Sequence, residues 1–125
     1  MLIGDFMFFP KDLPKGSETE MFATETLLVH TIPSVIKGLP IAFGFHSDIA
    51  INGEFELSWE IYGAGRRLGD FGGPMEVRLA PNEVQKTAFK LPDFEVPEEG
   101  QYTFVLFAGN ERLMDAELEI RLPRE

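Results

Sequence analysis

His46, Ser47 and Asp48 are consecutive and are the three residue types of a hydrolase catalytic triad. A working triad needs the serine, the histidine and the acid in line, each within hydrogen-bond reach of the next. Neighbouring residues of a strand point to opposite faces of the sheet, so these three side chains cannot line up. We interpret them as the end of a strand that runs into a turn, and we predict no catalytic residue and no enzymatic activity.

Metal binding is the second chemistry that these residue types support. His46 and Asp48 would share one face of a strand, and His30 could join them, but the spacing does not bring the three together. Carboxylate oxygens are the ligands that Ca²⁺ prefers. A second acidic group consists of Asp93, Glu95, Glu98 and Glu99, without the spacing of a known calcium loop. We predict no metal and no cofactor, and we leave open whether this acidic group binds a cation.

The charge of the chain narrows the class of partner. The 125 residues include 21 acids and 11 bases, which gives a formal net charge of −10. Such a surface repels phosphate groups, so we predict no binding to nucleic acid or to a membrane.

The absence of cysteine excludes disulfides and suits a reducing compartment. The N-terminal segment lacks the basic region of a signal peptide, and no apolar run approaches the roughly 18 residues of a membrane helix. We therefore expect a cytoplasmic protein.

The elements that carry these side chains are predicted to be strands. Most segments alternate apolar and polar residues and are separated by Gly, Pro and Asn, which is typical of all-β proteins. Turns are predicted at Asn52-Gly53, at Gly63-Ala64-Gly65 and at Gly72-Gly73-Pro74, and a loop is predicted at 33–38. The expected strands are 2–9, 21–31, 40–46, 55–61, 66–71, 75–79, 84–91, 101–108 and 112–122.

One segment predicts how these strands are arranged. A strand ends near Leu91, the chain crosses through prolines and acids, and a new strand begins with Gly100-x-Tyr102-x-Phe104. This order resembles the corner of an immunoglobulin-like β-sandwich, in which a tyrosine near the start of strand F bonds back to the crossing. The resemblance implies one domain, 1–125, built as an antiparallel sandwich of seven to nine strands with an extra N-terminal strand.

The resemblance also assigns three core residues. It places Phe45 on strand B, Trp59 on strand C and Phe104 on strand F, where the family has a cysteine, a tryptophan and a cysteine. Burial of the two phenylalanines could then offset the missing disulfide, which typically contributes ~2–4 kcal/mol. The layout of the whole chain also resembles an uncharacterised bacterial family of short single-domain proteins, a likeness that implies no activity.

Strand F supplies the feature that favours a function. Its residues Tyr102, Phe104 and Leu106 should face the core, which leaves Val105 and Phe107 on the outer face. Neighbouring strands would flank them with acids, and an apolar strip with a polar rim is a common mark of an interaction site. The candidate interface consists of Val105, Phe107, Tyr62, Glu56, Glu60, Glu117 and Glu119. The alternative is that the N-terminal strand or a loop covers the strip.

We therefore predict a non-enzymatic interaction or assembly module that binds through this outer face, either to a second copy as a homodimer or to another protein. The alternative function is the binding of a small ligand or a sugar through loop aromatics such as Phe71 or Phe94. Burial of Val105 and Phe107 in an oligomer would favour the first function, and a cleft with exposed aromatics would favour the second. A hydrolase or metal-dependent enzyme is the third class.

Overall fold

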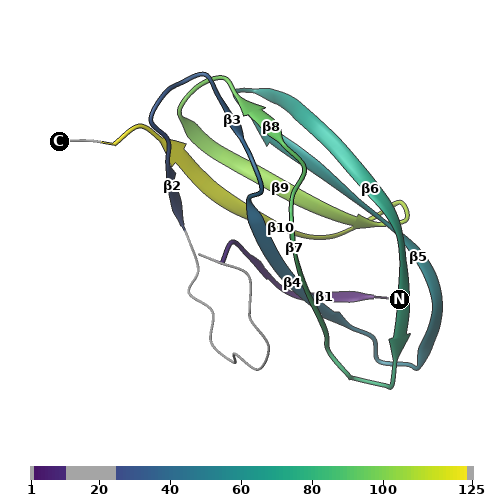
Figure 1. Cartoon of the computed structure of the whole chain (residues 1–125). Coiled ribbons are helices and arrows are strands. Elements are labelled where there is room, and N and C mark those ends of the chain that lie inside the picture. Colours follow the sequence, from purple (N-terminus) through teal and green to yellow (C-terminus); the bar gives the residue numbers. More distant parts are fainter. Residues whose placement is uncertain (1, 11–24, 124–125) are drawn as a thin grey trace.

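Two β-sheets make up most of the computed structural model, which describes residues 2–10 and 25–123 (Figure 1). The larger sheet consists, in spatial order, of β2 (Thr26–Leu28), β10 (Glu111–Arg121), β9 (Gly100–Ala108), β5 (Ile51–Gly63) and β6 (Arg66–Leu79). The smaller sheet consists of β1 (Ile3–Phe8), β4 (Pro40–His46) and β7 (Gln85–Lys90). A separate pair is formed by β3 (Ser34–Ile36) and β8 (Phe94–Val96).

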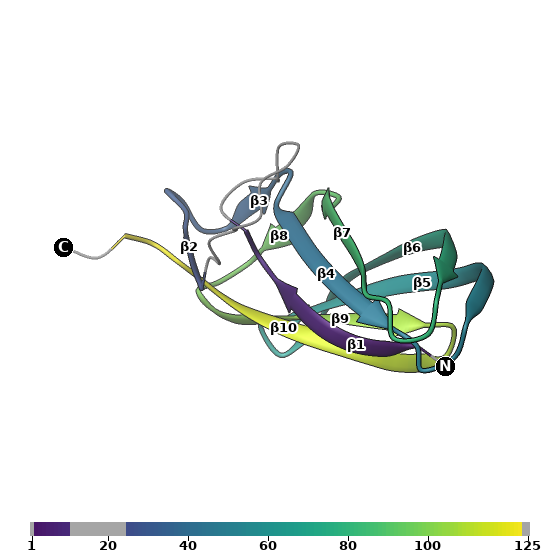
Figure 2. The same cartoon turned by 90° about the horizontal axis from the view of Figure 1, so that it is seen from below.

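The two sheets pack face to face as a β-sandwich, which confirms the predicted all-β class (Figure 2). Strand pairs are antiparallel except for β2 with β10, which is parallel. The described part of the chain has ten strands, because β3 and β8, of three residues each, are additional and the strands expected at 66–71 and 75–79 are one strand, β6. Of the strand expected at 21–31, only β2 is seen, and 21–24 lie outside the described residues. Among the described residues, no helix is long and apolar enough to span a membrane.

The alternation of apolar and polar residues decides which side chains enter the core. On β5, Leu57, Trp59 and Ile61 are buried, and the residues between them point to the other face. On β10, Leu118 and Ile120 are fully buried in the same way. The alternation in the sequence thus divides the side chains of both strands between the core and the outer face.

A two-residue turn joins β5 to β6. Ala64 and Gly65 have φ values of 53° and 74°, and Gly63 pairs with Arg66 across the turn. Positive φ at both central residues is the geometry of a type I′ turn, whose twist matches that of the flanking strands. The predicted hairpin is confirmed.

The other two predicted turns are wrong. Asn52-Gly53 lies within β5, and Gly72-Gly73-Pro74 lies within β6, which runs unbroken for 14 residues. β6 is an edge strand, and an edge strand tolerates proline because it needs ladder hydrogen bonds on one side only. The loop predicted at 33–38 is also corrected, since β3 forms there by pairing with β8.

Tyr102 forms the predicted corner. Its side chain is fully buried, and its hydroxyl donates a hydrogen bond to the backbone carbonyl of Glu98. The backbone of Gly63 lies so close to the ring that any Cβ at this position would collide with it. The bond ties the start of β9 to the segment that leaves β8.

The core residues assigned by the resemblance are buried, but their contacts differ from the family pattern. Phe45 and Phe104 have exposed fractions of 0% and 1%. From the smaller sheet, Phe43 and not Phe45 meets Trp59, with centroids 5.3 Å apart and planes at 74°, and Phe89 also meets it, at 5.7 Å. Phe104 instead packs edge-on against Phe9, with centroids 4.8 Å apart.

The two sides of the sandwich are closed to different degrees. On one side, β1 pairs with β4 and also lies against β10, so the N-terminal strand bridges the two sheets (Figure 2). On the other side, β6 and β7 are edge strands, and each pairs with one neighbour only among the described residues. The sandwich is therefore open between β6 and β7.

We predict that Tyr102→Phe lowers the free energy of unfolding by about 0.5–1.5 kcal/mol, the net contribution of one such hydrogen bond. Urea denaturation measures this change. Tyr62→Phe is the matched control, because Tyr62 is 38% exposed and its hydroxyl bonds to the side chain of Glu60 at the surface. A loss for Tyr102→Phe no larger than that of the control would contradict the role of the corner.

The role of Tyr102 also predicts how the free energy of unfolding changes at alkaline pH. Burial raises the pKa of Tyr102 above its ordinary value. An unfolded tyrosine loses its proton near pH 10, so the raised pKa leaves stability unchanged below about pH 10 and lowers it as the pH rises further. Tyr102→Phe should lose less stability over that alkaline range than the wild type.

Candidate functional site

The residues with triad chemistry have structural partners. His46 Nδ1 lies 2.8 Å from Asp5 Oδ1, which joins β4 to β1. Ser47 is fully buried, its hydroxyl accepts a hydrogen bond from the N–H of Ile49, and its carbonyl accepts one from Asn82. These residues form a strand end and a turn, as the sequence predicts.

The predicted lack of a metal site stays a prediction. Among the described residues, no three or more His, Asp or Glu side chains gather closely enough to hold a metal ion. His30 therefore does not join His46 and Asp48, and the acids around the β8–β9 crossing do not converge. Glu99 instead accepts a hydrogen bond from the N–H of Leu122.

The outer face of β9 does not expose the expected apolar strip. Val105 is only 4% exposed, and Phe107 is half-buried. In register, Val105 lies between Glu60 on β5 and Asp115 on β10, so longer side chains flank the short valine on both sides. β1 belongs to the other sheet, and whether a loop covers Val105 stays open as the alternative.

The rest of the candidate interface is polar and partly paired. Glu56 and Glu117 are exposed. Glu60 accepts a hydrogen bond from Tyr62, and Glu119 lies 3.0 Å from the guanidinium of Arg121. Val105 therefore adds little exposed apolar surface to this face, and the interface stays a prediction.

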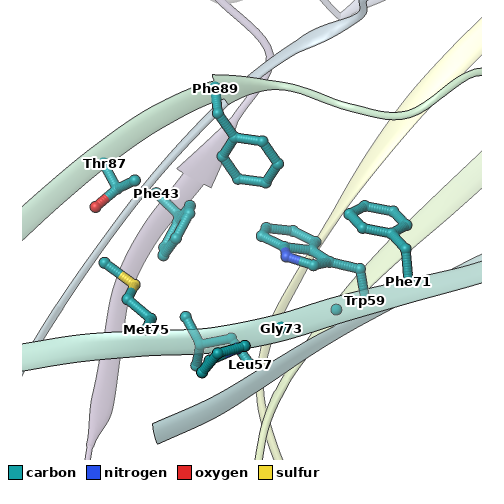
Figure 3. A pocket seen from close by; sticks show the side chains of 10 residues that line it. Phe43, Leu57, Trp59, Phe71, Gly73, Met75, Thr87 and Phe89 are labelled. Carbon is teal, nitrogen blue, oxygen red and sulfur yellow. The ribbon is translucent and has the colours of Figure 1, made fainter. Parts of the chain in front are cut away.

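An apolar cavity lies instead at the open side of the sandwich. It has a volume of about 340 Å³ and lies between β6 and β7; we call it the aromatic groove (Figure 3). The residues that line it are Phe43, Leu57, Trp59, Phe71, Gly72, Gly73, Pro74, Met75, Thr87 and Phe89. None of these side chains carries a charge, and seven of the ten residues lie on β5 or β6, with one on β4 and two on β7.

Trp59 is the centre of the groove. Its ring lies parallel to Phe71, with centroids 6.1 Å apart and planes at 8°, and it meets Phe89 edge-on at 5.7 Å. Trp59 and Phe43 are buried, whereas Phe71 and Phe89 are half-buried. The first two rings therefore form the floor, and the other two form walls that solvent reaches (Figure 3).

A missing side chain gives the groove its depth. On β6, Phe71, Gly73 and Met75 alternate on the inner face, and Gly73 pairs with Leu57. A Cβ built on Gly73 meets no atom within 4 Å. The space that a larger residue would fill is thus part of the groove.

Two of the lining residues have polar side-chain groups, Trp59 and Thr87. The indole N–H of Trp59 forms no hydrogen bond within the described part of the chain. Every fully buried side-chain N or O atom there does have a hydrogen-bond partner, so the indole nitrogen is not fully buried. Figure 3 shows this nitrogen on the side of the ring that faces Leu57 and Met75. Thr87, which carries a hydroxyl, is the second lining residue with a polar side chain.

Of the residues that line the groove, the sequence predicts a binding role for Phe71. Phe71, proposed as a loop aromatic, lies on β6 and lines the groove, whereas Phe94 is 7% exposed and packs against Phe104. Gly72-Gly73-Pro74 is the sequence feature that could have indicated the groove, since a glycine on an edge strand, here Gly73, leaves space beside it. The sequence instead predicts a turn there.

Comparisons with known proteins support the fold. No family model and no curated protein matches this chain. An immunoglobulin-like protein of Pseudomonas aeruginosa matches with a TM-score of 0.51 and 14% identity over 97% of each chain. The chain has the immunoglobulin-like fold.

Similar domains also occur inside larger enzymes. The alkylpurine DNA glycosylase AlkC of Pseudomonas fluorescens, in a complex with DNA, matches with a TM-score of 0.50 and 14% identity over 78% of this chain. A β-glucosidase of Listeria innocua matches with a TM-score of 0.50 and 16% identity over 97% of this chain. This chain spans only 28% and 16% of those two proteins, so the likeness concerns the fold and not their activities.

We predict that Trp59→Ala lowers the free energy of unfolding by ~3–5 kcal/mol, as truncation of a large core side chain does. The fluorescence of Trp59 in the folded wild type should be blue-shifted, because the ring is 3% exposed. Phe71→Ala should cost less, below about 2 kcal/mol, since that ring is already half in solvent. A solvent-like emission maximum, or equal losses for the two variants, would contradict the assignment of floor and wall.

Proposed function

We propose that this protein is a non-catalytic binding domain that takes an apolar or aromatic group into the aromatic groove. The observation that carries the proposal is the set of half-buried rings on an open edge between two sheets. Removing apolar surface from water is favourable by roughly 25 cal/mol of free energy per Å². A concave apolar site with few polar groups is also the usual form of a ligand pocket, and about 340 Å³ lies within the ordinary range of roughly 300–1,000 Å³.

The chemistry of the lining favours binding over catalysis. General acid–base catalysis needs a titratable side chain within hydrogen-bond reach of the reacting group. The groove is lined by rings, aliphatic groups, a thioether, a hydroxyl and glycines. It therefore offers shape and apolar contact, without a group that transfers protons near neutral pH.

The polar groups favour an apolar ligand over a sugar. A sugar presents many hydroxyls, each of which loses hydrogen bonds to water unless the site replaces them. The groove offers the N–H of Trp59 and the hydroxyl of Thr87 among its side chains. This supports an apolar group that carries one or two hydrogen-bond acceptors.

The test is titration with N-phenyl-1-naphthylamine, a neutral apolar dye that the net charge of −10 does not repel. We expect saturable binding with one site per chain, enhanced dye fluorescence, and quenching of Trp59 by energy transfer. Gly73→Leu should lower dye affinity at least tenfold, because the new side chain grows into open space inside the groove.

Gly69→Leu is the matched control. Gly69 lies on the same strand, its Cβ also meets nothing within 4 Å, and it does not line the groove. Its dye affinity should equal that of the wild type. Absence of dye binding to the wild type would overturn the proposed function, and equal binding to both leucine variants would move the binding site elsewhere.

A further inference from the structure

We propose that the natural occupant of the aromatic groove is an extended segment of a partner protein, which adds as a strand to the free edge of β7. Its apolar residues would enter the groove, and acidic residues would alternate with them on the outer face. This inference rests on the proposed function and names its partner class.

The free edge of β7 provides the backbone groups. β7 runs for six residues and pairs with β4 on one side only. Each of these residues has a backbone N–H and a C=O, and in an edge strand part of this set is left for an added strand. β6, across the groove, is a poorer template because Pro74 lacks an N–H.

The inner face of β7 directs the added side chains. Thr87 and Phe89 alternate on that face and line the groove. Paired strands lie about 4.8 Å apart and share a two-residue side-chain period. Every second side chain of an added strand would therefore point between the sheets, where Gly73 leaves space on the opposite wall.

The outer face of β7 selects the charge of the partner. Lys86 and Lys90 are exposed, and neither forms an ion pair within the described part of the chain. Their cross-strand neighbours on β4 are Gly44 and Pro40, which carry no charge. Opposite charges on adjacent strands are favourable and like charges are not. The two lysines thus favour an acidic strand, and they disfavour β7 of a second copy.

The test uses a panel of capped seven-residue peptides with Phe, Leu or Val at the second, fourth and sixth residues and Glu between them. A second panel has Lys in place of Glu, and a third has N-methyl groups on alternate backbone nitrogens of the Glu peptides, placed in either phase. Binding is measured by displacement of N-phenyl-1-naphthylamine and by hydrogen exchange. We expect the best Glu peptide to bind at least tenfold more tightly than its Lys counterpart. N-methylation of one of the two alternate sets of backbone nitrogens should lower its affinity at least tenfold. Amide exchange should slow on β7.

The double variant Lys86→Glu/Lys90→Glu should reverse the preference for Glu over Lys peptides and leave dye affinity unchanged, since neither lysine lines the groove. Lys37→Glu is the matched control, because Lys37 is exposed and lies outside β7 and the groove. Its peptide preference should stay that of the wild type. Dye binding without any peptide binding, equal affinity for both charges, tolerance of N-methylation in both phases, or exchange protection on β6 instead of β7 would each overturn the docked strand. The first of these results would leave the apolar site intact and point to a small molecule.

Discussion

The contact between Trp59 on β5 and Phe43 on β4 joins the two sheets, and the rest of the open side is built around it. The two rings meet edge-on at 5.3 Å, which brings the positive edge of one ring to the negative face of the other. Phe89 approaches the same indole from β7, and Phe71 lies over it from β6. Trp59 therefore contacts aromatic residues from three other strands, and it is both part of the core and the floor of the groove.

The difference between the two sides of the sandwich follows from how the N-terminal strand packs. β1 pairs with β4 and lies against β10, and Phe9 beyond it meets Phe104 in the core. No described strand does the same between β6 and β7. Burial of apolar surface is the main favourable term in folding. The rings on the open side are only half-buried, so a ligand that covers them would gain free energy by removing their remaining surface from water. That residual surface is what our proposed function uses.

The free edges carry features that limit unwanted pairing. Pro74 interrupts the hydrogen-bonding edge of β6, and Lys86 and Lys90 place charges on β7. Proline and lysine on edge strands are common ways to prevent self-association. An edge that rejects a second copy can still accept a strand of opposite charge, and this is the selectivity that we propose for β7. On the outer face of β9, which the sequence favours as an interface, Val105 is buried and lies in register between Glu60 and Asp115.

Local patterns in the sequence were sufficient for the fold class, because the alternation on β5 and β10, the turn at Ala64-Gly65 and the corner at Tyr102 depend on residues that are near one another in the chain. They were insufficient where a strand depends on a distant partner. Gly72-Gly73-Pro74 has turn composition, yet pairing with β5 makes it part of an edge strand, and β3 exists only because β8 lies beside it. The groove is a product of tertiary structure alone: it needs Trp59, Phe71 and Phe89 from three strands to meet where two sheets separate. Periodicity assigns each residue to a face, but only the packing of the two sheets decides which inward-facing residues are covered and which remain open to a ligand.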